Sequence, residues 1–183
     1  MKKVFVFACA ALLASCNANT SEKTDSMKMG QDSTSSTAEN ISSPYPINYS
    51  SKFVMDNPKN AETLLTLWKD WDNGNLSAHK DLFADSVEMH FSDGTSMHTS
   101  RDSAVAAAQS ARSAFQTAVS SVDAIMAVKS TDKNENWALI WGKEVDTDKK
   151  GVVDSFYLQE TWRFNKDGKA DLFFQYRQAA AKK

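Results

Sequence analysis

The C-terminal part of the chain carries the pattern that decides the fold. Residues 156–178 read FYLQETWRFNKDGKADLFFQYRQ, with apolar side chains at every second position except Glu160 on either side of the polar segment 165–168. Such alternation is typical of β-strands with one buried face, and the Asp-Gly pair in the polar segment favours the tight turn of a hairpin. We therefore predict an antiparallel hairpin with strands at residues 156–164 and 170–178.

Two more strands are expected before this hairpin, at residues 122–129 and 137–145. A polar turn around residues 132–136 separates them, and a charged turn at residues 146–151 leads into the hairpin. Because these turns are too short for crossover connections, consecutive strands should be antiparallel. The C-terminal half is thus predicted to form a four-stranded meander.

Helices are expected in the preceding part of the chain. Asp56 or Asn57 can cap a helix that has Pro58 in its first turn and that ends at residues 73–75, and residues 77–83 suit a second, short helix. The first helix is indicated by apolar residues at helical spacing, which are Leu64, Leu65, Trp68 and Trp71.

A short hairpin and a third helix complete the predicted elements. Residues 87–91 alternate as a strand, residues 92–94 form a turn, and residues 95–98 return as its partner. An alanine-rich helix then begins at Ser100 or Asp102 and extends to about residue 119. Helices first and a strand meander last indicate the α+β class.

This order of elements resembles the nuclear transport factor 2-like superfamily, which includes ketosteroid isomerase, scytalone dehydratase and the SnoaL-like polyketide cyclases. The resemblance covers about residues 58–178. It implies a cone-shaped, curved antiparallel sheet wrapped round the N-terminal helices, with an apolar pocket inside. It implies no activity, because the superfamily contains enzymes, binding modules and dimerisation domains. The residues that carry it are LFADSV at 82–87, His90, the Asp93-Gly94 turn, ETWRF at 160–164, DGK at 167–169 and Gln175-Tyr176.

Glu160 is the first candidate for a catalytic residue. If alternate side chains of each strand point into the pocket, Glu160 shares the inward face with Leu158 and Trp162. Burial on such an apolar face raises the pKa of a carboxyl group and suits it to act as a general acid or base. The alternatives are a position at the rim beside a cation, or a strand with its faces inverted.

His90 is the second candidate, because an unperturbed imidazole titrates near neutral pH. Glu88 shares its face of the strand, whereas Val87, Met89 and Phe91 form the apolar face. If the apolar face is the one turned to the core, His90 and Glu88 are merely exposed to solvent.

Ligand contacts are expected from the aromatic and aliphatic side chains that would line such a pocket. On the last strand, the inward face is predicted to hold residues 170, 172, 174 and 176. The same aromatic residues could instead form plain core or a dimer face. The predicted ligand-binding residues are Trp68, Trp141, Leu158, Trp162, Phe174 and Tyr176.

Neither a metal site, nor a cofactor, nor a nucleic-acid partner is expected. The three histidines, His79, His90 and His98, show no known ligand spacing, and no Gly-x-Ser-x-Gly nucleophile motif is present. The chain has 21 basic and 23 acidic residues, so it lacks the basic excess that attracts phosphate backbones.

The first sixteen residues predict export and lipidation. A positively charged start is followed by an apolar run at residues 4–14, which is shorter than the roughly 20 residues that a spanning helix needs. The tetrapeptide LASC at residues 13–16 resembles the lipobox of bacterial lipoprotein signal peptides. The resemblance implies removal of residues 1–15 and acyl chains on Cys16. An ordinary secretory signal or a buried helix is the alternative.

The rest of the chain divides into a tether and one domain. Residues 16–51 are rich in Ser, Thr, Asn and charged groups, and such a segment buries too little apolar surface to fold. Residues 52–183 are expected to form the nuclear transport factor 2-like domain. Over the whole chain, 42% hydrophobic and 24% charged residues are the balance of a globular protein.

These features together predict a protein of the bacterial cell envelope, held on a membrane through Cys16 and facing the periplasm or the cell surface. Its domain is expected to bind a small apolar or amphipathic molecule without catalysis. One rival is an enzyme of the isomerase, dehydratase or cyclase type that uses Glu160 or His90 in proton transfer. The other is an interaction module whose open sheet face pairs two copies as a homodimer or docks an envelope partner.

Overall fold

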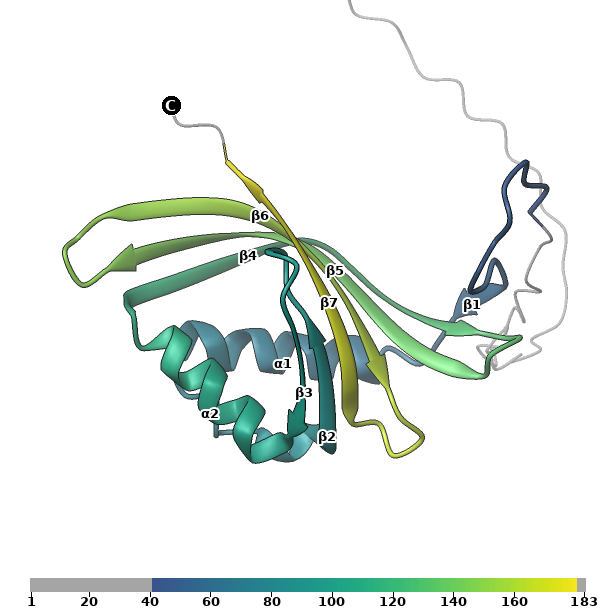
Figure 1. Cartoon of the computed structure of the whole chain (residues 1–183), viewed down its shortest axis with the longest axis horizontal. Coiled ribbons are helices and arrows are strands. Elements are labelled where there is room, and N and C mark those ends of the chain that lie inside the picture. The colour runs from purple at the N-terminus through teal and green to yellow at the C-terminus, as the bar shows by residue number, and fades with distance from the viewer. Residues whose placement is uncertain (1–40, 181–183) are drawn as a thin grey trace, which may run out of the picture. The chain divides into compact units, whose positions relative to one another are not determined.

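The computed structural model describes residues 41–180, which form one curved sheet of seven strands and two α-helices (Figure 1). The predicted signal peptide, Cys16 and most of the predicted tether lie outside the described residues. Within residues 41–180 there is no helix long and apolar enough to cross a membrane. The elements are β1 (Phe53–Met55), α1 (Lys59–Asn73), the 3₁₀ turn η1 (Lys80–Leu82), β2 (Phe83–His90), β3 (Ser96–Ser100), α2 (Arg101–Arg112), β4 (Phe115–Ser130), β5 (Glu135–Asp148), β6 (Val153–Phe164) and β7 (Ala170–Ala179).

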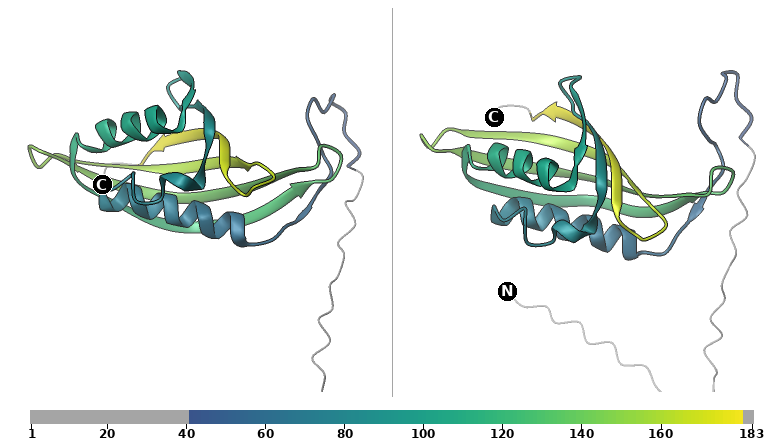
Figure 2. Two further views of the ribbon diagram at one scale, coloured as in Figure 1. Left: turned by 90° about the horizontal axis from the view of Figure 1, so that it is seen from below. Right: turned by 60° about the horizontal axis from the view of Figure 1, so that its bottom comes forward.

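The strand order in the sheet is β1-β4-β5-β6-β7-β2-β3. All neighbouring strands are antiparallel except β2 and β7, which pair in parallel and bring the early hairpin beside the end of the meander. Both helices lie on the same side of the curved sheet in Figure 1, and Figure 2 shows them from that open side. The predicted α+β cone and its four-stranded meander are therefore confirmed.

Helix α1 packs directly on the sheet because one strand position has no side chain. Its buried face includes Leu64 and Trp68, and Gly74 ends it in the left-handed conformation. A Cβ at Gly142 of β5 would overlap the carbonyl oxygen of Ser121 and come within 3.0 Å of the Trp68 ring. Glycine at this position therefore lets Trp68 approach the sheet.

The prediction that the third helix extends to about residue 119 is wrong. Helix α2 ends at Arg112, and β4 begins at Phe115 and runs for 16 residues, well beyond the predicted strand 122–129. Buried Arg112 donates hydrogen bonds to the carbonyl oxygens of Trp71, Asp72 and Phe115, which holds the chain at this boundary. Pairing along almost the whole of β5 outweighs the helical pattern that residues 113–119 continue.

The early elements also differ in extent from the prediction. The helix predicted at residues 77–83 is reduced to the short turn η1, and β2 already begins at Phe83 rather than at residue 87. The turn at residues 92–94 forms as predicted, and its partner strand β3 runs from Ser96 to Ser100. Before the helices, β1 pairs with β4, and Tyr49 packs edge-on against Trp137 with 5.9 Å between ring centroids.

The last strand contains a β-bulge that changes which side chains face inward. Arg163 pairs with Leu172 but the next residue, Phe164, pairs with Ala170, so Asp171 is one extra residue on β7. Because side chains alternate along a strand, one extra residue reverses the faces of everything beyond it. Beyond the bulge, β7 therefore turns its odd-numbered residues inward, and the predicted inward face at residues 172, 174 and 176 is wrong.

Candidate functional site

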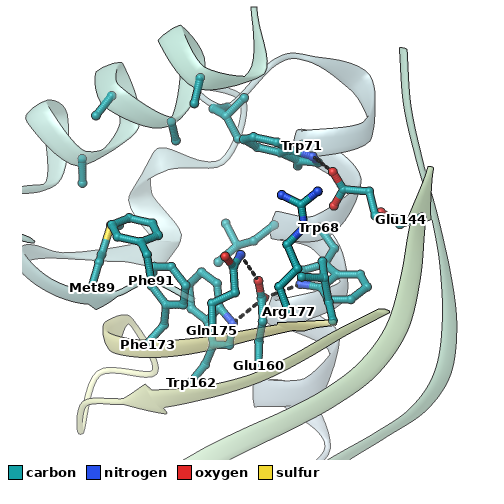
Figure 3. A pocket seen from close by; sticks show the side chains of 18 of the residues that line it. Trp68, Trp71, Met89, Phe91, Glu144, Glu160, Trp162, Phe173, Gln175 and Arg177 are labelled. Atoms are coloured by element: carbon teal, nitrogen blue, oxygen red, sulfur yellow. Dashed lines mark hydrogen bonds between the residues drawn. The ribbon is translucent and has the colours of Figure 1, made fainter. Parts of the chain in front are cut away.

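A cavity of about 500 Å³ lies between the helices and the inner face of the sheet (Figure 3). Its volume is within the range of small-molecule sites in proteins. Most of its lining is apolar, and the polar groups come from β4, β5, β6 and β7. The apolar lining comprises Leu67, Trp68, Trp71, Leu76, Phe83, Met89, Phe91, Met97, Ala104, Ala107, Ala108, Ala111, Phe115, Phe156, Leu158, Trp162 and Phe173.

Helix α2 forms one wall of the cavity and leaves the space open. Its contribution consists of Ala104, Ala107, Ala108 and Ala111, whose methyl groups project little from the helix. Ala104 is buried, whereas Ala107 and Ala111 are exposed to solvent as well as lining the cavity. The cavity therefore opens to solvent along this helix.

Glu160 of β6 lies inside the cavity and is held by three donors. Its Oε2 accepts hydrogen bonds from Trp68 Nε1 at 2.7 Å and Trp162 Nε1 at 2.9 Å. Its Oε1 accepts a bond from Gln175 Nε2 at 3.0 Å. The three partners come from α1, β6 and β7, so the carboxyl group links the helix to the two strands beneath it.

Opposing effects act on the pKa of Glu160. Burial raises the pKa above its ordinary value, since the side chain is only 5% exposed and the charged form loses its hydration. The hydrogen bonds from Gln175, Trp68 and Trp162 act in the opposite direction. Burial is the larger effect, and the pKa is raised.

A second acidic centre lies on β5, where Glu144 and Asp146 occupy successive inward positions. Both are buried, at 5% and 4% exposed, and both line the cavity. Glu144 Oε1 accepts a hydrogen bond from Trp71 Nε1 at 2.8 Å. The two carboxyl groups also hydrogen-bond each other, which requires a proton on one of them.

Burial raises the pKa of Glu144 to about 8, with further contributions from the hydrogen bond and the charge of Asp146. Burial also raises the pKa of Asp146, while the bond from Glu144 and the positive charges of Arg177 and Arg112 oppose that rise. The pair therefore holds a proton at neutral pH, on Glu144, with Asp146 as the acceptor.

Two arginines set the charge around this pair. Arg177 lines the cavity, donates to Asp154 Oδ2 at 3.0 Å and lies over the Phe156 ring at 3.4 Å from its centroid. Arg112 lies at the junction of α1, α2 and β4, where it bonds three carbonyl oxygens. The Asp146 end of the cavity thus already has two cations close to it.

Solved structures with the same architecture were found at low sequence identity. One is SalBIII, an epoxide hydrolase/cyclase-like enzyme of pyran ring formation in the polyether salinomycin, with a TM-score of 0.56 and 12% identity over 68% of this chain and 95% of that chain. Another is an LEH-like epoxide hydrolase of M. tuberculosis, with a TM-score of 0.55 and 8% identity over 66% and 83%. A third is an NTF2-like protein of unknown function from Exiguobacterium sp. 255-15, with a TM-score of 0.52 and 15% identity over 64% and 99%.

The chain has the nuclear transport factor 2-like fold. No family model matches its sequence, and no curated protein matches it. At these identities the likeness to solved structures concerns the fold, and the site has to be judged from its own residues.

The nuclear transport factor 2-like cone brings some of the predicted ligand-binding residues to the cavity and leaves others outside. Trp68, Leu158 and Trp162 line it. The predicted place of the other three in the pocket is wrong. Trp141 lies on the opposite face of β5 from Glu144, and the β7 bulge turns Phe174 and Tyr176 away from the cavity.

His90 also lies away from the cavity lining. Its Nε2 bonds Glu88 Oε1 at 2.8 Å, and its ring stacks on Phe174 with 4.6 Å between centroids. Met89 and Phe91, from the other face of the same segment, line the cavity. The apolar face of this hairpin is therefore the inward one, which places His90 on the outer side of the sheet.

Sequence reasoning missed the second acidic centre and two further polar groups, Gln175 and Arg177. A signal was present in the sequence, because Glu144 and Asp146 continue, in steps of two, the small and apolar series Ala138, Ile140 and Gly142. It was overlooked because the strand was predicted to end at residue 145, with residue 146 in the turn. Within residues 41–180, no group of three His, Cys, Asp or Glu side chains is arranged to hold a metal ion.

Proposed function

We propose that this chain is a lipid-anchored protein of the bacterial cell envelope that binds a small apolar or amphipathic molecule in the cone and does not transform it. The observation that carries the proposal is the cavity of about 500 Å³, lined mainly by aromatic, aliphatic and alanine side chains. Burial of apolar ligand surface in such a site supplies most of the binding free energy.

The non-catalytic part of the proposal rests on the two residues first considered as catalysts. Both oxygens of Glu160 are occupied by Trp68, Trp162 and Gln175, so this carboxyl group acts as a structural link between α1 and the sheet. His90 is bonded to Glu88 and stacked on Phe174 outside the cavity. Three of the roughly four acceptor positions of the Glu160 carboxylate are therefore filled by the protein's own donors, and His90 lies outside the cavity lining.

The anchoring part of the proposal rests on the sequence. The positively charged start, the short apolar run and LASC at residues 13–16 support cleavage before Cys16 and acylation of its thiol. Labelling of growing cells with radioactive palmitate tests this directly. The chain should incorporate label, and Cys16→Ser should abolish it; an unlabelled wild-type chain contradicts the anchor.

Native mass spectrometry of the chain purified from its own host tests the binding function. The wild type is expected to retain a small molecule, and Ala108→Leu should lose it because the larger side chain enters the cavity. Ala106→Leu is the matched control, since Ala106 is exposed on the same helix and does not line the cavity. Equal retention by both variants contradicts binding in this cavity.

An enzyme of the isomerase, dehydratase or cyclase type is the second candidate. The observation that favours it is the raised pKa of Glu144, about 8, which suits proton transfer near neutral pH. SalBIII and the LEH-like epoxide hydrolase, which share the fold, are enzymes by their names. Turnover of the retained molecule by the wild type, lost in Glu144→Gln, would decide for this candidate.

A homodimer through the outer face of the sheet is the third candidate. Aromatic side chains on that face include Tyr157 and Tyr176, which are 48% and 59% exposed. Tyr157 and Tyr176 lie on the neighbouring strands β6 and β7, so they belong to one surface. The subunit count from the same native mass spectra tests it, and a monomer at micromolar concentration contradicts it.

A further inference from the structure

One carboxyl oxygen in the cavity lacks the partners that its burial demands. Asp146 is 4% exposed and lines the cavity, and its Oδ1 has no hydrogen-bond partner among the described residues. The Asp146 carboxyl group also shares a proton with Glu144. A carboxylate oxygen can accept two hydrogen bonds, so even a shared proton leaves Oδ1 with free acceptor capacity. Buried acceptors without partners are costly, and a ligand that donates to this one removes the cost.

Glu160 shows that side chains around the cavity can supply hydrogen-bond donors to a buried carboxyl group. Three donors from α1, β6 and β7 converge on the Glu160 carboxyl group. At the other acidic centre, Trp71 donates to Glu144 and no side chain donates to Asp146 except Glu144 itself. The open acceptor is therefore a local feature of the Asp146 end.

The surrounding charges restrict the group that can fill this position. Arg112 and Arg177 oppose the rise that burial causes in the pKa of Asp146, and Asp154, the ion-pair partner of Arg177, also acts on it. The two positive charges near Asp146 are thus already matched by the negative charges of Asp146 and Asp154. An ammonium group would add a third positive charge in a poorly hydrated site, whereas a hydroxyl group donates one hydrogen bond without any charge. The rest of the ligand must be apolar, because the other lining side chains are mainly aromatic and aliphatic.

Resting on the proposed binding function, we propose that Asp146 Oδ1 accepts a hydrogen bond from the hydroxyl group of an apolar alcohol bound in the cavity. The alcohol lies with its hydrocarbon part against the aromatic side chains and the alanines of α2. The Glu144–Asp146 pair is then the polar end of the site, and Glu160 stays part of the scaffold.

A series of probes with one shape tests this in the wild-type chain. The affinities of 1-adamantanol, 1-fluoroadamantane and 1-adamantanamine are measured by isothermal titration calorimetry on the full chain. The alcohol should bind about tenfold more tightly than the fluoride, which offers no donor, as expected for one net hydrogen bond. It should also bind more tightly than the amine, which is cationic at neutral pH.

Two variants then test whether the preference for the alcohol over the fluoride depends on Asp146. Asp146→Ala should bind the alcohol and the fluoride equally, while Glu88→Gln, a carboxylate change on the outer face, should keep the tenfold preference. Thermal unfolding by circular dichroism checks that each variant is folded. The probe series on the wild type does not depend on that outcome.

The possible failures are distinguishable. If none of the three probes binds, the proposed binding function fails for ligands of this size. If the alcohol and the fluoride bind the wild type equally, the cavity binds apolar molecules but Asp146 is not the polar contact. A preference for the alcohol that survives in Asp146→Ala likewise overturns the role of Asp146.

Discussion

The two acidic centres of the cavity, Glu160 on β6 and the Glu144–Asp146 pair on β5, are satisfied in opposite ways. Glu160 receives three hydrogen bonds from neutral donors on three elements. Glu144 receives one such bond, from Trp71, and otherwise depends on a proton shared with Asp146. Both centres are buried, so burial alone does not separate them.

This difference distinguishes a buried carboxyl group with a structural role from one that is available to a ligand. A carboxyl group that receives several neutral donors resists change and holds its neighbours in place, because an apolar replacement leaves those buried donors without partners. A group that relies on a proton responds to pH and to ligands, because both alter how its acceptors are filled. Glu160 fits the first description and the Glu144–Asp146 pair fits the second.

Replacement of Glu160 should have the largest effect on stability. Glu160→Leu leaves the donors of Trp68, Trp162 and Gln175 buried without an acceptor, and we expect a loss of about 4 kcal/mol in the free energy of unfolding. Glu160→Gln should cost only about 1 kcal/mol, since its carbonyl oxygen still accepts from the tryptophans and the Gln175 amide can flip. Urea denaturation measures both, and equal losses would contradict the assigned structural role.

The pH dependence of stability should reveal the proton on Glu144. Its pKa is raised to about 8 in the folded protein from an ordinary value near 4.5, so the folded state binds more protons than the unfolded state between these values. The free energy of unfolding should therefore fall as pH rises from about 4.5 to 8, by roughly 4 kcal/mol. The pKa values of Glu160 and Asp146 are also raised in the folded protein, so both groups add to the loss of stability with rising pH.

Glu144→Gln is the variant that isolates this effect, because glutamine can donate to Asp146 without titrating. Its stability should change less with pH than that of the wild type. Denaturation curves at pH 5, 7 and 9 supply the comparison. A wild type whose stability rises over this range would contradict a shared proton.

Removal of a single indole N–H donor should cost less stability, and the cost should differ between the two acidic centres. Trp162→Phe takes one of three donors from Glu160 and should cost about 2 kcal/mol, including the lost packing on Phe173, whose ring is 4.7 Å from that of Trp162. Trp71→Phe should cost about 1 kcal/mol, because Trp71 is only partly buried and a protonated Glu144 needs the bond less. Thermal denaturation ranks the two, and a larger loss for Trp71→Phe contradicts the ranking.

The smallest effect is expected on the outer face of the sheet. Tyr176→Ser changes a side chain that is 59% exposed and lies outside the cavity, so stability should change by less than about 0.5 kcal/mol. Affinity for the probe alcohol should also remain as in the wild type. A marked loss of stability that depends on protein concentration would instead reveal a dimer contact on this face.

Much of the fold could be predicted from local patterns, while the site could be predicted only in part. The hairpin at residues 156–178 was predictable because alternation and an Asp-Gly turn act over a few residues. The bulge at Asp171 was not, since an extra residue in one strand is visible only against its partner strand. This single residue decided that Gln175, and not Phe174 or Tyr176, reaches Glu160.

The length of β5 decided the rest of the site. Glu144 and Asp146 look like the start of a charged turn when the strand is judged by its apolar residues alone. Pairing with β4 and β6 carries the strand on to Asp148 and keeps both carboxyl groups on the inward face. Backbone pairing between distant segments thus placed two charged residues where their composition predicted exposure.

The sequence by itself determined the α+β class and the four-stranded meander, because both follow from the periodicity of neighbouring residues. The inward positions of Glu160 and of the apolar face of the early hairpin were among the alternatives that the sequence left open, and the structure decided them. The tertiary structure alone decided the end of α2, the reversal of β7 and the meeting of Glu144 with Asp146 inside the cavity. These features depend on strand pairing and burial between segments far apart in the chain. The free energy of those contacts cannot be inferred from the order of neighbouring residues.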